Sequence, residues 1–120
     1  MGKIEVLEVA VGMPLIKREI DANLESYQSI VAGLIEKVSV TEDIDLYANE
    51  ERNLLELDKN ILLMYQGKPY QFVKDNVFFA SFDEKGKIAS LTNEHIQEIK
   101  NRIALAFLTT GEQVYTVNIS

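Results

Sequence analysis

The only histidine in the chain, His95, is the residue type best suited to acid–base chemistry near neutral pH. It lies in the stretch SLTNEHIQEIKNRI, where Thr92 is a good helix N-cap and helical spacing places Glu98 and Arg102 on the same face as His95. A histidine–carboxylate contact could move a proton, but a general base also needs a nucleophile or a substrate site beside it. One helix face supplies neither, so we expect His95 to be half exposed in the first turn of a surface helix.

Metal and nucleophile chemistry also lack the residues they need. The acidic stretch TEDID offers Glu42, Asp43 and Asp45, but a calcium-binding loop requires a glycine at its sixth position, which is Tyr47 here. There is no cysteine, and the six glycines are too dispersed to form a phosphate-binding loop. We therefore expect no catalytic residue, no metal and no cofactor, and an enzyme is the least favoured class.

Binding chemistry has better candidates. Several tyrosines flank predicted turns, and a tyrosine at a loop end can stack on a nucleotide base and donate a hydrogen bond. Basic residues in neighbouring turns could contact a phosphate, and amide side chains could bind the polar edges of the base. The alternative is that these tyrosines are ordinary strand residues. The candidate ligand-binding residues are Tyr65, Tyr70, Arg52, Lys68, Asn49 and Gln71.

The charge pattern restricts the possible partners. The net charge is −7, with an isoelectric point near 4.7, so direct binding to a nucleic-acid backbone is not expected. Eight acidic and only three basic residues lie between Glu36 and Lys59. This segment is either a solvated face or a surface that docks on a basic protein partner.

Length and composition predict a single cytoplasmic domain. A chain of 120 residues with 47% hydrophobic residues can bury one core, and the absence of cysteine suits a reducing compartment. No apolar run approaches the roughly 20 residues needed to span a bilayer. The start, MGKIEVLEVAV, alternates charged and apolar residues, unlike a signal peptide.

Hydrophobic periodicity predicts an α+β fold with a mostly antiparallel sheet and two main helices. Asp21 or Asn23 can cap the first helix, and Gly33 is placed to end it in a left-handed conformation. The piece 61–76 is compatible with a helix or with short hairpin arms around Gln66-Gly67-Lys68-Pro69. The helices are expected at 23–34 and 93–108, and the strands at 3–11, 15–20, 35–40, 44–48, 53–57, 77–82, 88–91 and 114–119. The apolar last strand could pair with another subunit, so a homo-oligomer is expected.

The run IDANLESYQSIVAGLIEKV resembles the signature of a family known as domain of unknown function 3846. Its pattern is matched by Ile20-Asp21, Leu24-Glu25, Tyr27-Gln28, Val31, Gly33 and Ile35-Glu36. The stretches LYANEERNLLEL and FFASFDEKGKIASLTNEHIQEIKNRI resemble later blocks of the family, and the likeness covers most of residues 4–103. The segment 61–76 matches less closely, and the tail 109–120 lies outside the pattern. The family has no assigned catalytic residue that could be transferred.

The resemblance implies a phage or mobile-element protein, and small acidic proteins in that setting often counter host defence. Our first hypothesis is a non-enzymatic, cytoplasmic protein that sequesters a small nucleotide-derived signal, with stacking by Tyr65 or Tyr70 and phosphate contacts from Arg52 or Lys68. The second is an acidic inhibitor that binds a host defence or nucleic-acid-handling protein. An enzyme that uses His95 is the third.

Overall fold

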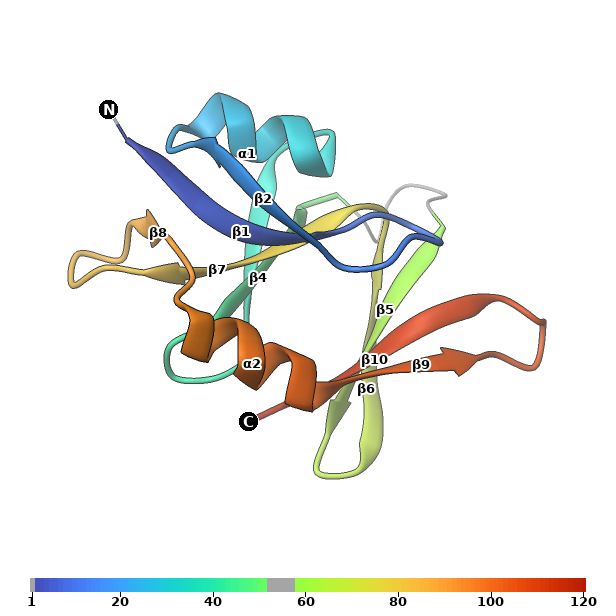
Figure 1. Cartoon of the computed structure of the whole chain (residues 1–120). Helices are drawn as coiled ribbons and strands as arrows, with labels where there is room; N and C mark the ends of the chain where they lie inside the picture. The colour runs from blue at the N-terminus through green and yellow to red at the C-terminus, as the bar shows by residue number, and fades with distance from the viewer. Residues whose placement is uncertain (1, 52–57) are drawn as a thin grey trace.

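The computed structural model describes residues 2–51 and 58–120, and within them the chain forms two helices and ten strands (Figure 1). The helices are α1 (Leu24–Val31) and α2 (Asn93–Arg102). The strands are β1 (Lys3–Val9), β2 (Ile16–Asp21), β3 (Ile35–Ser39), β4 (Asp45–Asn49), β5 (Lys59–Tyr65), β6 (Lys68–Lys74), β7 (Val77–Phe82), β8 (Ile88–Ala89), β9 (Ile103–Phe107) and β10 (Gln113–Ile119).

The strands form two sheets, and the predicted α+β class is confirmed. The first sheet has the order β2-β1-β7-β4-β3, with β8 paired to β7, and all its pairs are antiparallel. The second has the order β6-β5-β10-β9 and contains one parallel pair, β5 with β10. The strands expected at 3–11 and 15–20 pair as the β1–β2 hairpin, and those expected at 77–82 and 88–91 pair as the β7–β8 hairpin.

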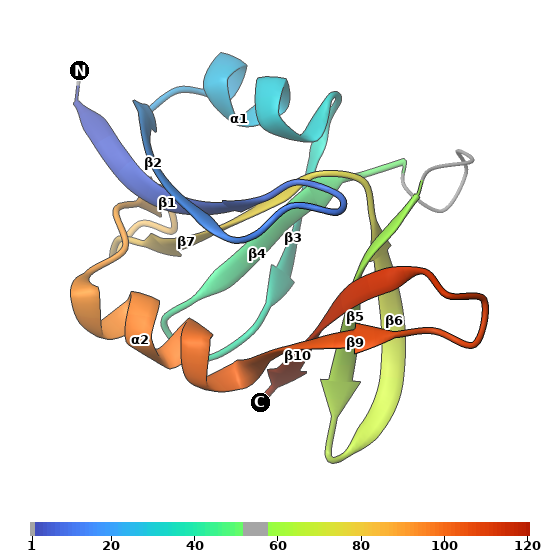
Figure 2. The same cartoon turned by 45° about the vertical axis from the view of Figure 1, so that its right-hand side comes forward.

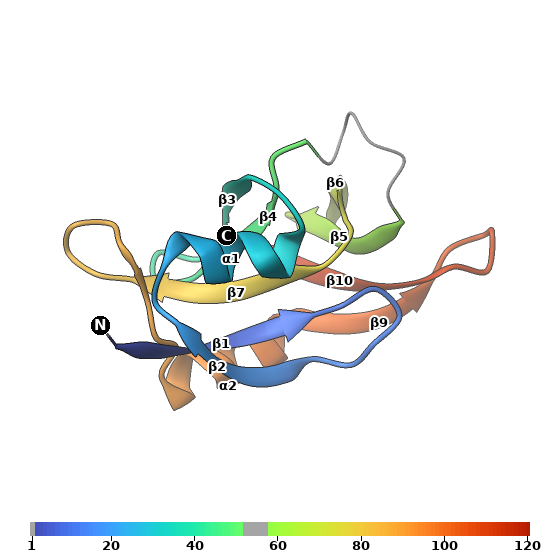
Figure 3. The ribbon, with the colours of Figure 1, turned by 90° about the horizontal axis from the view of Figure 1, so that it is seen from above.

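Both faces of the first sheet are covered, which explains why β1 lacks a simple alternation of apolar and polar residues. Helix α1 packs on one face through Tyr27, Ile30 and Val31 (Figure 3). The second sheet and α2 cover the other face, where Phe79 and Leu46 share one cluster with side chains of β5, β6 and β10 (Figure 2). The two sheets therefore share a core.

Helix α1 begins as predicted but ends early. Asn23 is the N-cap, and its Oδ1 accepts a hydrogen bond from the Ser26 N–H at 2.8 Å. The left-handed C-cap is Ala32, with φ of 59°, and not Gly33 as the sequence suggested. Gly33 serves close packing instead, because a Cβ there would lie 2.7 Å from the Asn49 Nδ2. The helix end is therefore determined by packing against β4.

The second helix is shorter than predicted, and its expected last part is a strand. Residues 103–107 read IALAF, which alternates large and small side chains as well as fitting a helical stripe. Antiparallel pairing with β10 places Ile103 opposite Val117 and Phe107 opposite Gln113. Phe107, which lies within the helix expected at 93–108, is 69% exposed. The long-range pairing with β10 outweighs the local helical pattern.

Three other expectations concern the second sheet. The piece 61–76 forms hairpin arms, β5 and β6, and no helix. The predicted strand at 53–57 lies outside the described residues. The last strand, β10, has β5 on one side and β9 on the other, so it has no free edge for a second subunit. The strand at the edge beside it is β9.

Candidate functional site

A tight turn at the end of the β5–β6 hairpin presents the predicted tyrosines. Tyr65 pairs with Lys68, so Gln66 and Gly67 are the two residues of the turn. Both have positive φ, 51° for Gln66 and 78° for Gly67, as a type I′ hairpin turn requires. Glycine adopts this conformation readily, but a glutamine there is strained, and such strain is frequent at functional sites.

The rings of Tyr65 and Tyr70 lie together at this turn. Their centroids are 6.4 Å apart, with a 57° angle between the ring planes, and the residues are 43% and 62% exposed. The Gln66 amide donates to the Tyr65 hydroxyl at 3.4 Å. The two tyrosines form a hollow of about 200 Å³ with Gln66, Lys68 and Pro69. We call these five residues the hairpin tip.

The β5–β6 ladder is irregular at the hairpin tip. Leu63 pairs with Gln71, and the next pair is Met64 with Pro69, so Tyr70 is an extra residue on β6. A bulge of this kind breaks the regular pleat and re-aims a side chain, and bulges are frequent next to binding sites. The bulge is therefore the local feature that sets the direction of the most exposed tyrosine.

The hairpin carries a charge opposite to that of the chain. Residues 59–74 contain Lys59, Lys68 and Lys74 and no acidic residue, in a chain with a net charge of −7. Lys59 lies 4.8 Å from the centre of the Phe72 ring, in a cation–π contact. The absence of acidic residues from this segment is visible in the sequence, although only Lys68 of its three lysines is among the predicted contacts. This segment is therefore a locally basic part of an acidic protein, and its charge favours anions.

Two other predicted site residues, Asn49 and Gln71, are not in the hairpin tip. Asn49 is 4% exposed, and its amide donates to the Val31 carbonyl at 3.2 Å and accepts from the Glu51 N–H at 2.7 Å. Its side-chain amide therefore binds the end of α1. Gln71 pairs with Leu63 in the ladder and does not line the hollow. Arg52 lies outside the described residues.

His95 lies in the first turn of α2, as predicted. The Thr92 N–H donates to His95 Nδ1 at 3.0 Å, and the His95 N–H donates to Thr92 Oγ1 at 3.1 Å. This reciprocal capping box occupies one ring nitrogen in a structural role. Glu98, the carboxylate we expected beside His95, forms an ion pair with Arg102 at 3.5 Å.

His95 lines an open hollow of about 440 Å³. The hollow brings together two segments far apart in the sequence, the turn after β3 and helix α2. Its walls include Glu42, Asp43, Glu94 and Glu98 together with Arg102. Among the described residues, no group of three or more histidine and acidic side chains is arranged to hold a metal ion.

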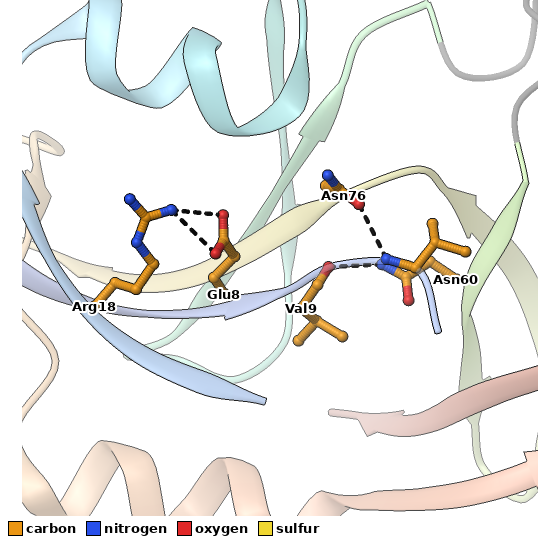
Figure 4. A network of polar contacts seen from close by, with 6 residues as sticks. Glu8, Val9, Arg18, Asn60 and Asn76 are labelled. Carbon is orange, nitrogen blue, oxygen red and sulfur yellow. Dashed lines mark hydrogen bonds and ion pairs between the residues drawn. The ribbon is translucent and has the colours of Figure 1, made fainter. Parts of the chain in front are cut away.

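A polar hollow beside α1 has two ion pairs in its lining. It has a volume of about 530 Å³ and lies between α1 and the β1–β2 hairpin. The Arg18 guanidinium donates to both carboxylate oxygens of Glu8, at 3.1 and 3.0 Å (Figure 4). At its rim Lys3 pairs with Asp21 at 3.0 Å. Four of the charged residues in its lining are therefore engaged in ion pairs with each other.

The fold and the hairpin tip together define an α+β protein with an aromatic, locally basic protrusion on an acidic body. Neither α1 nor α2, nor any other helix in the described part of the chain, is long and apolar enough to cross a membrane. The chain belongs to the family described as Domain of unknown function (DUF3846), whose model matches residues 4–104. Searches of curated proteins and of solved structures found no match to the chain.

Proposed function

We propose that this protein binds a small nucleotide-type ligand at the hairpin tip and sequesters it without chemical change. The observation that carries this proposal is the pair of exposed tyrosine rings, 6.4 Å apart, beside Lys68 on a hairpin with three lysines and no acidic residue. Tyrosine faces bind planar bases, and a lysine ammonium binds phosphate. The hairpin combines both in one exposed position.

The ring geometry favours stacking on an outer ring face. A base inserted between two rings needs them parallel and about 7 Å apart, twice the usual stacking distance. The rings of Tyr65 and Tyr70 are tilted by 57°, so they support each other and leave the exposed face of Tyr70 for the ligand. Lys68 begins β6, two residues before Tyr70, and supplies the cation for a phosphate.

The biological role of such binding is sequestration. In the phage or mobile-element setting, the protein acts in the host cytoplasm and lowers the free concentration of a nucleotide signal that a defence system uses. The hollow of 200 Å³ is shallow for a whole nucleotide, so the ligand extends beyond it toward the lysines of the hairpin. No proton transfer by His95 is part of this proposal.

Calorimetric titration with ADP-ribose and with a cyclic dinucleotide tests the proposal. Tyr70→Ala should weaken binding about 5- to 100-fold, the range expected for one base stacked on one ring. Lys68→Ala should weaken it less, and the difference should shrink as salt is raised. Phe82→Ala and Lys85→Ala are matched controls, because both residues are exposed on another hairpin.

The ligand should also be recovered intact after incubation with the protein. Equal affinities for all four variants would refute the hairpin tip as the site, and ligand turnover would refute sequestration.

A second candidate function follows from the acidic hollow around His95. Glu42 and Asp43 from one turn face the same space as Glu94 and Glu98 from α2. This concentration of charge suits docking on a basic face of a host protein. The doubly substituted variant Glu94→Gln, Glu98→Gln should then lose a host partner that native protein captures at low salt. Tyr70→Ala should retain that partner.

A further inference from the structure

Strand β9 is an edge strand of the second sheet and lacks the usual protection of an edge. Exposed edges present unpaired backbone groups, and proteins protect them with charged residues or proline. The other terminal strands of the two sheets follow this rule: β2 reads IKREID, β3 reads IEKVS and β6 reads KPYQFVK. In contrast, β9 reads IALAF, with neither a charge nor a proline.

The side chains of β9 are also unusually exposed for their type. Leu105 is 50% exposed and Phe107 is 69% exposed. The neighbouring strand β10 reads QVYTVNI and has no charge either. Between residues 103 and 120 the only charged side chain is Glu112, in a chain with 19 acidic and 12 basic residues. The β9–β10 hairpin is therefore a projection with a single charged side chain, seen at the right in Figures 1 and 2.

The hairpin turn determines which backbone groups of β9 face outward. The Leu108 N–H donates to the Glu112 carbonyl at 2.8 Å, so these two residues form a hydrogen-bonded pair. Hydrogen-bonded and non-hydrogen-bonded pairs alternate along an antiparallel ladder. Ile103, Leu105 and Phe107 are therefore the residues whose N–H and C=O groups point away from β10. These are also the large apolar residues of the strand.

We infer that β9 pairs with β9 of a second copy of this chain, antiparallel and centred on Leu105. The two four-stranded sheets then become one sheet of eight strands across a twofold axis. Leu105 lies opposite Leu105 of the second copy, and Ile103 lies opposite Phe107. This inference is independent of the proposed ligand, because the hairpin tip belongs to β5 and β6 and stays free in the dimer.

The charge pattern favours a second copy as the occupant. Two chains of −7 repel each other, so association through a part of the surface without acidic residues costs less than association elsewhere. Strand β9 has no acidic residue. Its large and small side chains alternate, and the alternation is the same from either end of the strand. Antiparallel self-pairing therefore places large residues opposite large ones and Ala104 opposite Ala106. About six backbone hydrogen bonds would form.

Sedimentation equilibrium of the full chain tests the dimer. The native protein should show a concentration-dependent mass that rises from 13.6 kDa toward twice that value. Leu105→Lys places two like charges opposite each other and should return the mass to 13.6 kDa at every concentration. Leu34→Lys is the matched control, because Leu34 is 52% exposed and belongs to another part of the fold. A monomeric native protein, or dimers that persist in Leu105→Lys, would overturn the inference.

Disulfide formation tests the register, since the chain has no cysteine of its own. In Leu105→Cys the two Cα atoms of the dimer should be about 5.5 Å apart, within the range that a disulfide spans. In Phe107→Cys they should be about 13 Å apart, too far for a disulfide. Mild oxidation should therefore cross-link Leu105→Cys at least ten times faster than Phe107→Cys. Equal rates, or faster cross-linking of Phe107→Cys, would overturn the register.

Discussion

The Asn60 side chain in β5 donates a 2.8 Å hydrogen bond to the carbonyl oxygen of Val9 in β1, and this contact joins the two sheets (Figure 4). The same amide nitrogen donates to the Asp75 carbonyl at 2.8 Å. Asn60 is 2% exposed, and its hydrogen bond to Val9 is buried. Nearby, the Val11 N–H donates to Asn76 Oδ1 at 3.0 Å. The buried Asn60 amide therefore connects β5 of the second sheet to β1 of the first.

Asn60→Leu should lower the free energy of unfolding by about 1–3 kcal/mol, because it removes a buried donor from two carbonyl groups. Urea denaturation measures this loss. Asn118→Leu is the control, since Asn118 is exposed on β10, and its effect should stay within about 0.5 kcal/mol. If both variants unfold at the same urea concentration, the contact between the sheets does not depend on Asn60.

Gln66→Gly should stabilise the protein by about 0.5–1 kcal/mol, because it removes a side chain from a position with φ of 51°. Thermal denaturation should show a melting temperature higher by a few degrees. The stabilised variant should still bind the nucleotide-type ligand, since the proposed contacts come from Tyr70 and Lys68. A lower melting temperature would show that the Gln66 amide contributes more through its contact with Tyr65 than its backbone strain costs.

Asp45→Asn should stabilise the protein at neutral pH. Burial raises the pKa of Asp45 above its usual 3.8, while the positive charge of Lys37 acts in the opposite direction. The folded protein therefore binds this proton more readily than the unfolded chain. The contribution of Asp45 to stability is complete below pH 3.8 and is lost as the pH rises through the folded-state pKa. The gain from Asp45→Asn should thus be present at pH 7 and vanish near pH 3. A gain that is equal at both pH values would contradict this explanation.

Tyr47→Phe should change the alkaline stability of the protein. Burial, together with the charges of Asp45 and Tyr27, raises the pKa of Tyr47 to about 12 from its usual 10.0. Tyr47 ionises at a lower pH in the unfolded chain than in the folded protein. The free energy of unfolding therefore falls by roughly 2–3 kcal/mol through this residue as the pH rises from 10 to 12. Urea denaturation of both proteins at pH 8 and pH 11.5 measures the difference. The variant should lose less stability than the native protein over that interval, and an identical loss would refute the assignment to Tyr47.

Local signals in the sequence were sufficient to predict most of the first sheet and the starts of both helices. Asn23 and Thr92 cap α1 and α2 as expected, because an N-cap depends on a few neighbouring residues. The end of α1 could not be predicted in this way. The close approach of Gly33 to Asn49 depends on β4, which lies far along the chain.

The end of α2 could not be predicted for the same physical reason. The sequence IALAF fits both a helical stripe and a strand, and only the position of β10 decides between them. The candidate site was predicted in part. Tyr65, Tyr70 and Lys68 meet because a single tight turn joins them, which is a local relationship. The roles of Asn49 and Asn60 depend on contacts between distant strands, and one sequence contains no direct signal for these contacts.

The central claim is that the hairpin tip binds a nucleotide-type ligand, and mapping of amide chemical shifts on ¹⁵N-labelled protein tests it most directly. On titration with ADP-ribose or a cyclic dinucleotide, we predict saturable shifts confined to residues 64–72, and their loss in Tyr70→Ala. Shifts centred on Thr41–Asp43 and Glu94–Arg102, or no saturable shift with either ligand, would contradict the account.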